Sequence, residues 1–386
     1  METLEYKQCS RCLMDTTSSL ITFDEKGICN FCKGYEDSLQ KFVYGFTSLQ
    51  RKQKLESLIA KIKEDGSGNT YDCILGVSGG MDSSYLCILA KEWGLRPLIV
   101  HFDNGWNTDL AVTNIQNVIS RLGYELYTYV INWEQFKDLQ ISYFKASVLD
   151  IEVPNDQLIF AVLFKVAKEK GIKNIISGNN IFTEEILPDD WAFKRKFDLT
   201  NLHNIHKKYG TRSIKGFPTL SLKDRLRYKD EGYKIHTVFE YTEYNHDEIT
   251  RRLQLEFNYI FYEGKHFESI FTRFYQGYIL PVKWNIDKRK AHLSCLVMAG
   301  FMSREEAVIA LEKPPYPAHL QLEDKIYVCK KWDMTVEEFD RIMAKPPVPH
   351  DIYGFDQLPF VKRILKKVEL VWKYQVLKRL GLLNTK

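Results

Sequence analysis

The segment from Tyr71 to Ala90 constrains the fold more than any other part of the chain. A short apolar run, residues 71–77, leads into the loop SGGMDSS at 78–84, and a helical apolar stretch follows at once. A strand that passes through a glycine turn into a helix is typical of parallel α/β sheets. The free N–H groups and the positive end of the helix dipole favour an anion at such a turn. We therefore expect a phosphate-binding loop.

This loop lacks the lysine of a Walker A motif, which reaches the β and γ phosphates and suits γ-phosphoryl transfer. Asp82 stands in its place. Its carboxylate would repel a phosphate unless Mg²⁺ bridges the two groups or the side chain caps the helix. Such a loop suits holding pyrophosphate as a leaving group. The residues expected to hold it are Ser78, Gly79, Gly80, Asp82, Ser83 and Ser84.

Strands and helices are expected to alternate after the loop. Apolar runs occur at 97–102, 124–131 and 174–178, and amphipathic stretches occur at 82–93, 108–122 and 155–170, with Asn155 or Asp156 as the expected cap of the last. This alternation predicts an α/β fold with a doubly wound parallel sheet. Beyond residue 200 the alternation stops, and helices broken by proline are expected. We predict three domains: a four-cysteine knuckle at 1–40, a loop-bearing domain at 41–205 and a mostly helical domain at 206–386.

Four of the eight cysteines lie in the first 32 residues. Cys9 with Cys12, and Cys29 with Cys32, form two C-x2-C pairs separated by sixteen residues. This spacing is typical of a zinc site in which four thiolates complete a tetrahedron, with no position left for catalysis. We predict structural Zn²⁺; two redox pairs or an iron–sulfur cluster remain alternatives.

The composition is that of an ordinary globular protein. The chain has 386 residues, 45% of them hydrophobic, and its 54 basic and 50 acidic side chains leave a formal charge of +4. This balance does not predict a nucleic-acid binder. No apolar run approaches the ~20 residues of a membrane span, and residues 1–8 lack the pattern of a signal peptide. A cytoplasmic setting is expected.

The loop and two other segments resemble the PP-loop ATP pyrophosphatases. These segments are HFDNGW at 101–106 and SGNN at 177–180, each at the end of a predicted strand. Enzymes of this superfamily split ATP into AMP and pyrophosphate and adenylate an oxygen of the second substrate. The resemblance implies that ATP and Mg²⁺ are used, and that Asp103, Gly178 and Asn179 flank the nucleotide.

A narrower resemblance is to the N-acetyl sugar amidotransferase family. It rests on the knuckle, the loop, residues 181–188, Trp191, residues 288–294, Gly300 and residues 303–307. The family converts an acetamido group of a nucleotide-activated sugar into an acetamidino group for bacterial O-antigen, lipopolysaccharide or flagellar sugars. An ATP-dependent, AMP-forming amidotransferase is therefore expected, with Zn²⁺ in the knuckle.

Catalytic roles follow from this reaction. Asp82 would reach Mg²⁺, and Lys288 and Arg289 would neutralise charge on the phosphates. Basic runs are as often a solvated helix face. Glu184 or Glu185 would accept a proton from attacking ammonium or bind a sugar hydroxyl. The alternative for this pair is a carboxylate contact with a helix N-terminus.

The ammonia must come from elsewhere on this interpretation. Residue 2 is glutamate, not the cysteine of an N-terminal nucleophile glutaminase, and no cysteine lies in a G-x-C-x-G elbow. We expect a separate glutaminase subunit, alone or with a synthase-like channel subunit, or free ammonium. Neither a nucleic-acid partner nor a membrane span is expected.

Two other functions stay open. The basic and aromatic segments 207–212 and 225–229 would suit a PP-loop enzyme that modifies tRNA by thiolation or lysidine-type amination. A nucleotide-binding regulator that leaves ATP intact is the second.

The basic amphipathic stretch 361–382 would dock on its own core, on a glutaminase or on a membrane surface.

Overall fold

A five-stranded parallel sheet forms the centre of the fold. A computed structural model describes residues 5–356. The strands lie in the order β3-β2-β1-β4-β5. Their bounds are β1 Cys73–Val77, β2 Pro97–Asp103, β3 Leu126–Val130, β4 Asn174–Ser177 and β5 Lys234–Thr237. The order reverses between β1 and β4, where a doubly wound sheet binds its ligands. The predicted fold class is confirmed.

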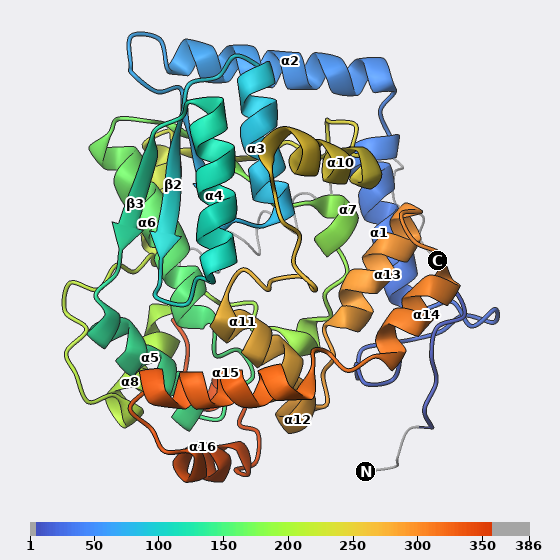
Figure 1. The fold of residues 1–386 in the computed structure, drawn as a ribbon, viewed down its shortest axis with the longest axis vertical. Coiled ribbons are helices and arrows are strands. Elements are labelled where there is room, and N and C mark those ends of the chain that lie inside the picture. Colours follow the sequence, from blue (N-terminus) through green and yellow to red (C-terminus); the bar gives the residue numbers. More distant parts are fainter. Residues whose placement is uncertain (1–4, 357–386) are drawn as a thin grey trace, which may run out of the picture.

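Helices lie on both faces of the sheet (Figure 1). The first eight α-helices are α1 Asn30–Leu39, α2 Ser48–Asp65, α3 Met81–Glu92, α4 Asp109–Leu122, α5 Trp133–Lys145, α6 Val153–Glu169, α7 Ile181–Glu184 and α8 Leu199–Tyr209. The others are α9 Leu222–Asp230, α10 His246–Phe257, α11 Ile270–Phe274, α12 Leu280–Trp284, α13 Arg289–Ala299, α14 Arg304–Glu312, α15 Ala318–Lys331 and α16 Val336–Met343.

The two layers explain why the central strands are continuously apolar. Helices α3 and α4 pack together on one face with α10, and α6 covers β1, β2 and β4 on the other. A strand covered on both faces has no side that water could reach. Ile74 and Leu75 of β1 are accordingly fully buried. Because α6 runs antiparallel to the strands that it covers, its first residues lie at the carboxyl ends of those strands.

The fifth strand lies beyond the predicted boundary at residue 205. β5 pairs with β4 in parallel, with Lys234 opposite Asn174. Lys234 and Ile235 are exposed, and His236 and Thr237 are half-buried. An exposed edge strand needs no apolar run, so the segment showed no strand pattern. The sheet therefore extends beyond 205, and the division into three domains stays a prediction.

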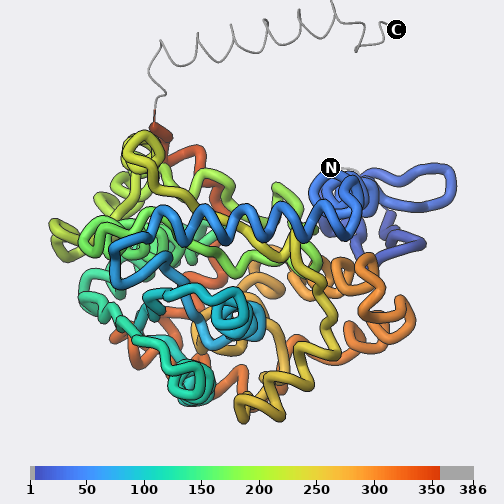
Figure 2. Tube along the Cα trace, turned by 90° about the horizontal axis from the view of Figure 1, so that it is seen from above, coloured from blue at the N-terminus to red at the C-terminus, as the bar shows by residue number. Residues whose placement is uncertain are grey.

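The N-terminal knuckle packs against the C-terminal part of the chain. Figure 2 shows the blue N-terminal segment beside the orange segment that contains α13 and α14. The Leu13 amide donates to Ser294 Oγ (3.0 Å), Arg304 donates to the Cys9 carbonyl (3.2 Å), and Lys290 forms an ion pair with Asp15. The knuckle is thus held against helices α13 and α14.

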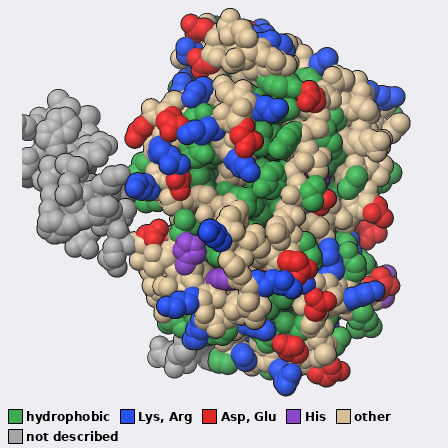
Figure 3. All heavy atoms as spheres, turned by 90° about the vertical axis from the view of Figure 1, so that its left-hand side faces the viewer, with side chains coloured by type: hydrophobic (Ala, Val, Ile, Leu, Met, Phe, Trp, Pro, Cys, Tyr) green, Lys and Arg blue, Asp and Glu red, His purple; other side chains and the backbone are tan. Residues whose placement is uncertain are grey.

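The charged side chains are mixed in sign on the surface that Figure 3 shows, where basic and acidic groups alternate around patches of hydrophobic side chains. Within residues 5–356, no helix is both long and apolar enough to cross a membrane. The basic stretch 361–382 lies outside the described residues.

Candidate active site at the carboxyl end of the sheet

The loop after β1 has a backbone that only glycine adopts easily. Gly79 has φ +86°, and a Cβ there would lie 2.8 Å from the Ala111 carbonyl oxygen. The Gly79 carbonyl accepts hydrogen bonds from the hydroxyls of Tyr259 (2.7 Å) and Tyr262 (3.0 Å). Gly80 is the N-cap residue of α3. Because no side chain caps α3 at Gly80, the N–H groups of its first turn remain available to bind an anion, as expected for this loop.

Asp82 is held by two neutral donors. Its Oδ1 accepts from Asn180 Nδ2 (2.8 Å) and from the Tyr244 hydroxyl (2.7 Å). Burial raises the pKa of Asp82, while the nearby ammonium of Lys265 opposes this shift. Within the described residues, Oδ2 makes no hydrogen bond. A carboxylate oriented in this way suits Mg²⁺, which binds oxygen ligands and keeps part of its water shell.

The loop after β4 lies directly against the glycine loop. A Cβ on Gly178 would lie 3.4 Å from Ser83 Cα, so both segments can approach a common ligand. The Asn179 amide donates to Ser177 Oγ (3.3 Å), and Asn179 itself is exposed. The Asn180 side chain caps α7 by accepting from the Phe182 amide (3.0 Å). The resemblance pointed to Gly178 and Asn179, and the structure brings this loop to the predicted place.

The two predicted glutamates point to different surroundings. Glu184 forms an ion pair with Lys265 (3.0 Å). Burial pushes the pKa of Glu184 up, but Lys265, His266 and the Asn180 amide together outweigh that effect and hold it below its ordinary value. Glu185 is exposed, and its Oε1 accepts from Ser38 Oγ of α1 (2.5 Å). Glu184 therefore belongs to the network around Asp82, whereas Glu185 contacts the helix that follows the knuckle.

A segment from the second half of the chain crosses the loop. Glu268 lies beside Gly80, where an added Cβ would lie 3.6 Å from its Oε1. The rings of His266 and His292 are 5.4 Å apart. Both nitrogens of His292 are buried and make no hydrogen bond with the residues described here. Burial lowers the pKa of His292 well below its ordinary value.

Lys288 lies in a second polar cluster, with Asp150, Glu152, Asp156 and Lys196. Burial lowers the pKa of Lys288, and the carboxylate of Asp150 opposes this shift most strongly. Lys196 pairs with both Asp150 (3.4 Å) and Asp156.

Glu152, not Asn155 or Asp156, is the N-cap residue of α6, so the predicted cap is wrong. Pro154 occupies the first turn and shifts the helix start toward it.

Arg289 has other partners, although it follows Lys288 directly. Its guanidinium pairs with Asp287 (2.7 Å) and donates to the Lys313 carbonyl (2.8 Å) and to carbonyls at the end of α14. None of its contacts within residues 5–356 involves the loop at 78–84. The side chain therefore closes the carboxyl end of α14, a position that favours a cation.

Arg289→Ala should lower stability and leave ATP turnover unchanged. The loss of an ion pair and several carbonyl hydrogen bonds should cost about 2 kcal/mol, seen as a lower Tm. Thermal unfolding and AMP formation should be compared with Arg341→Ala, which removes an exposed arginine at the end of α16. Reduced turnover at an unchanged Tm would instead return Arg289 to the catalytic role expected from the sequence.

Asp103 shapes the turn after β2. Its Oδ1 accepts from the Gly105 amide (2.9 Å) and from Asn107 Nδ2 (3.4 Å). Asn107 also contacts His101, and Asn104 Nδ2 donates to Asn155 Oδ1 (2.9 Å). The turn therefore connects the end of β2 to the start of α6. Asp103 lies at the carboxyl edge of the sheet, where the resemblance places the nucleotide.

The four N-terminal cysteines form one buried cluster. Cys9, Cys12, Cys29 and Cys32 have sulfurs within 4.8 Å of one another, and neighbouring sulfurs are 3.6–3.7 Å apart. A tetrahedral zinc with Zn–S bonds of about 2.3 Å would separate its sulfurs by roughly 3.8 Å. Backbone amides of Arg11, Cys12 and Cys29 donate to Cys9 Sγ. The donors and spacing fit zinc.

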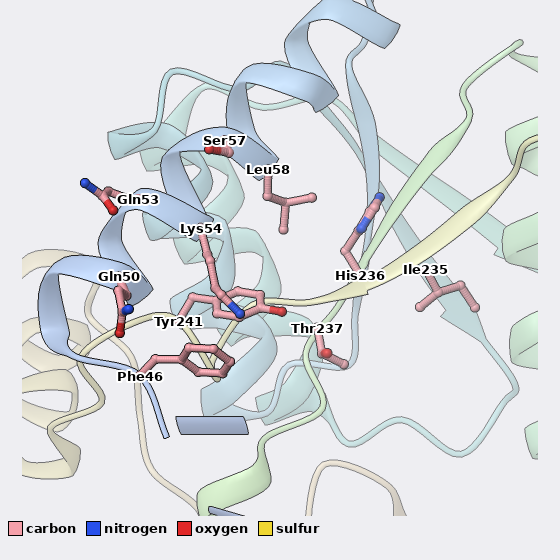
Figure 4. A pocket seen from close by; sticks show the side chains of 10 residues that line it. All are labelled: Phe46, Gln50, Gln53, Lys54, Ser57, Leu58, Ile235, His236, Thr237 and Tyr241. Carbon is pink, nitrogen blue, oxygen red and sulfur yellow. The ribbon is translucent and has the colours of Figure 1, made fainter. Parts of the chain in front are cut away.

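A surface groove of about 660 Å³ lies elsewhere, between the start of α2 and the edge strand β5 (Figure 4). Phe46 and Lys54 line one side, and His236 and Thr237 line the other. None of its lining residues is a predicted site residue. The chemically reactive groups converge at the loops after β1 and β4, so we place the site there.

Several site residues were missed from the sequence. Asn180 belongs to the SGNN run, which could have indicated it. Tyr244, Lys265 and Glu268 come from an aromatic and polar region with no recognised pattern. The sequence feature that could have indicated these three residues is that they belong to a region where charged side chains occur among many aromatic ones. Long-range packing brings them to the loop.

Comparisons with known proteins give a family for the C-terminal part. Residues 268–368 match the family model "LPS biosynthesis protein WbpG-like, C-terminal domain". An uncharacterised protein of Methanocaldococcus jannaschii is 28% identical over 321 residues, 81% of this chain and 96% of that protein. A tRNA(Ile)-lysidine synthase of Thermus thermophilus is 27% identical over 110 residues, 28% of this chain and 20% of the synthase.

Among solved structures, the NMN synthetase from Francisella tularensis is 14% identical in sequence to this chain, with a TM-score of 0.30. The match covers 57% of this chain and 100% of the synthetase chain. The matched domain and the glycine loop occur in one chain. The similarity to lipopolysaccharide-biosynthesis proteins expected from the sequence is confirmed over residues 268–368.

Proposed function

We propose that the protein is an ATP-dependent amidotransferase that converts an acetamido group of a nucleotide-activated sugar into an acetamidino group. The observation that carries this proposal is the WbpG-like domain at 268–368 in a chain whose first strand ends in SGGMDSS. A lipopolysaccharide-type domain points to a sugar, and the loop points to cleavage of ATP into AMP and pyrophosphate. The role would be in O-antigen, lipopolysaccharide or flagellar sugar synthesis.

The first step would activate the amide. An amide oxygen is a poor leaving group, so ammonia cannot displace it directly. Attack of this oxygen on the α-phosphorus of ATP forms a P–O bond, releases pyrophosphate and leaves an imidoyl adenylate. The serine hydroxyls and free amides of residues 78–84 would hold the pyrophosphate, and Asp82 would bind Mg²⁺. Asp103, at the end of β2, and Gly178 and Asn179, on the loop after β4, would flank the nucleotide at the same sheet edge.

Lys265 is the cation best placed to assist at the loop. It pairs with Glu184 and acts electrostatically on Asp82. A positive charge there would stabilise negative charge developing on the phosphates, an effect worth about 3 kcal/mol for a preorganised group. Lys288 would act from the neighbouring cluster.

The second step would use ammonia from a separate glutaminase subunit. Ammonia attacks the imidoyl carbon and AMP leaves, which gives the amidine. Because the glutaminase is a second protein, free ammonium at high concentration should replace it in the assay.

A tRNA-modifying PP-loop enzyme is the second candidate. It is favoured by the partial match to tRNA(Ile)-lysidine synthase. The match to the WbpG-like domain favours the sugar reaction.

The test incubates the full chain with ATP, Mg²⁺, ammonium chloride and a panel of nucleotide-activated diacetamido sugars. We expect AMP, pyrophosphate and a sugar whose mass falls because NH replaces oxygen. A parallel sample contains bulk tRNA in place of the sugars. Product on tRNA with none on any sugar would overturn the proposal and support the second candidate.

A further inference from the structure

We infer that Glu152, with Thr272 and Lys288 around it, takes the proton from the incoming ammonium and so generates the ammonia that attacks the activated sugar. The inference rests on the proposed function and assigns its missing base. Glu184 and Glu185, the candidates predicted from the sequence, have partners that suit this role less well.

Glu152 is connected to the glycine loop through the segment that leads into α11. Thr272 Oγ1 of α11 donates to Glu152 Oε1 (3.1 Å), and Glu268, four residues before Thr272, lies beside Gly80. From another direction, Asn155, one turn after Glu152 on α6, binds Asn104 at the end of β2. Two independent connections thus tie Glu152 to the carboxyl edge of the sheet.

The cluster around Glu152 has mixed charge. The titratable groups that face it are Asp150 before α6, Asp156 on α6, Lys196 after Trp191, Lys288 before α13 and Tyr275 after α11. Lys196 is occupied by Asp150 and Asp156. The Lys288 ammonium forms no ion pair or hydrogen bond with any residue in the described part of the chain. When Glu152 is ionised, two lysines face three carboxylates, so one more small cation would balance the charge.

The two buried glutamates differ in basicity. Burial, reinforced by Asp156 and Asp150, raises the pKa of Glu152 to about 8. Lys265 lowers the pKa of Glu184. A general base works best when its pKa lies near the working pH. Glu152 can therefore accept a proton from ammonium near neutral pH, whereas Glu184 is a weaker base and remains an ion-pair partner.

The step balances as follows. Ammonium gives one proton to the Glu152 carboxylate, which becomes a carboxylic acid, and ammonia is formed. The ammonia lone pair forms the C–N bond to the imidoyl carbon, and the C–O bond to AMP breaks. AMP leaves with that electron pair, one of the three ammonia protons moves to the sugar nitrogen so that the product is an amidinium, and Glu152 returns its proton to solvent after product release. No oxidant or reductant is needed.

The experiment compares Glu152→Gln with the wild-type full chain, using ammonium chloride and the sugar that the panel identifies. At pH 7 we expect kcat/KM for ammonium to fall at least about a hundredfold, as for loss of a general base. Pyrophosphate release in the first step should persist. Glu169→Gln, an exposed glutamate at the far end of α6, should behave as wild type.

The pH profile separates a base from a structural group. In the wild type, the carboxylate form increases with pH, so kcat/KM for ammonium should rise and reach half of its plateau near pH 8, the pKa of Glu152. In Glu152→Gln the rise should continue with the fraction of free ammonia. Hydroxylamine, which is unprotonated at pH 7, should restore amidoxime formation. Thr272→Val removes a hydrogen bond that favours the charged form, so it should move the rise to higher pH.

The outcomes distinguish the two proposals. A wild-type enzyme with no activity on any sugar defeats the proposed function and this inference with it. An active wild type whose ammonium profile is unchanged in Glu152→Gln defeats the inference alone. If Glu152→Gln does not fold, an unshifted profile in Thr272→Val defeats it as well.

Discussion

Asp82→Asn should reduce AMP formation from ATP by about a thousandfold with the fold intact. The amide can keep the hydrogen bond from Tyr244, which donates to Oδ1 (2.7 Å), and it has nearly the same volume as the carboxylate. It carries no negative charge, so it cannot balance Mg²⁺ at the phosphates. The change therefore removes charge from the site but little packing, and its effect should lie in turnover and not in Tm.

The measurement is pyrophosphate release at saturating ATP, with a titration of Mg²⁺ and a thermal melt. Asp109→Asn is the matched control, because Asp109 lies exposed in the first turn of α4, at the same sheet edge. It should keep near wild-type activity. If Asp82→Asn retains full activity at low Mg²⁺, Asp82 serves only to cap the helix, which is the alternative noted from the sequence.

Removal of the metal predicted in the knuckle should have the second large effect. Cys12→Ser, or extraction with a chelator, should lower Tm by about 10 °C, since a structural zinc is worth about 10–16 kcal/mol in small peptides and part of this would be lost here. Cys29 is the N-cap residue of α1, so the metal would anchor that helix. Tyr35 of α1 donates to the Phe182 carbonyl (3.0 Å), so activity should fall too.

Elemental analysis before and after extraction, thermal melts and limited proteolysis of the N-terminal segment check this prediction. Cys329→Ser is the control, because Cys329 is a buried cysteine of α15 outside the cluster. It should cost about 1 kcal/mol and release no metal. Iron in place of zinc would support the cluster alternative. Complete extraction with an unchanged Tm would exclude a structural metal.

The strongest sequence predictions concerned contiguous segments. The glycine loop and the cysteine pairs are patterns within a few residues, and each specifies a local backbone or a set of ligands. The central strands were predicted because burial on both faces requires a continuous apolar run. β5 was missed because its exposed edge position requires none.

The roles of single side chains depended on long-range contacts. Lys288 and Arg289 are neighbours in the sequence, yet the first faces Asp150 and Glu152 and the second pairs with Asp287 and α14. Adjacent residues on a helix point about 100° apart, so their partners depend on which elements pack on each side. The sequence could not distinguish them.

The sequence alone predicted the glycine loop after the first strand and the cluster of four cysteines, because both depend on residues that are close along the chain. Only the tertiary structure decided which side chains surround the reacting groups. Tyr244 reaches Asp82 across 162 positions, and Thr272 reaches Glu152 across 120. Such contacts follow from parallel strand pairing, which places the ends of distant strands at one edge, and from the packing of the C-terminal helices against that edge.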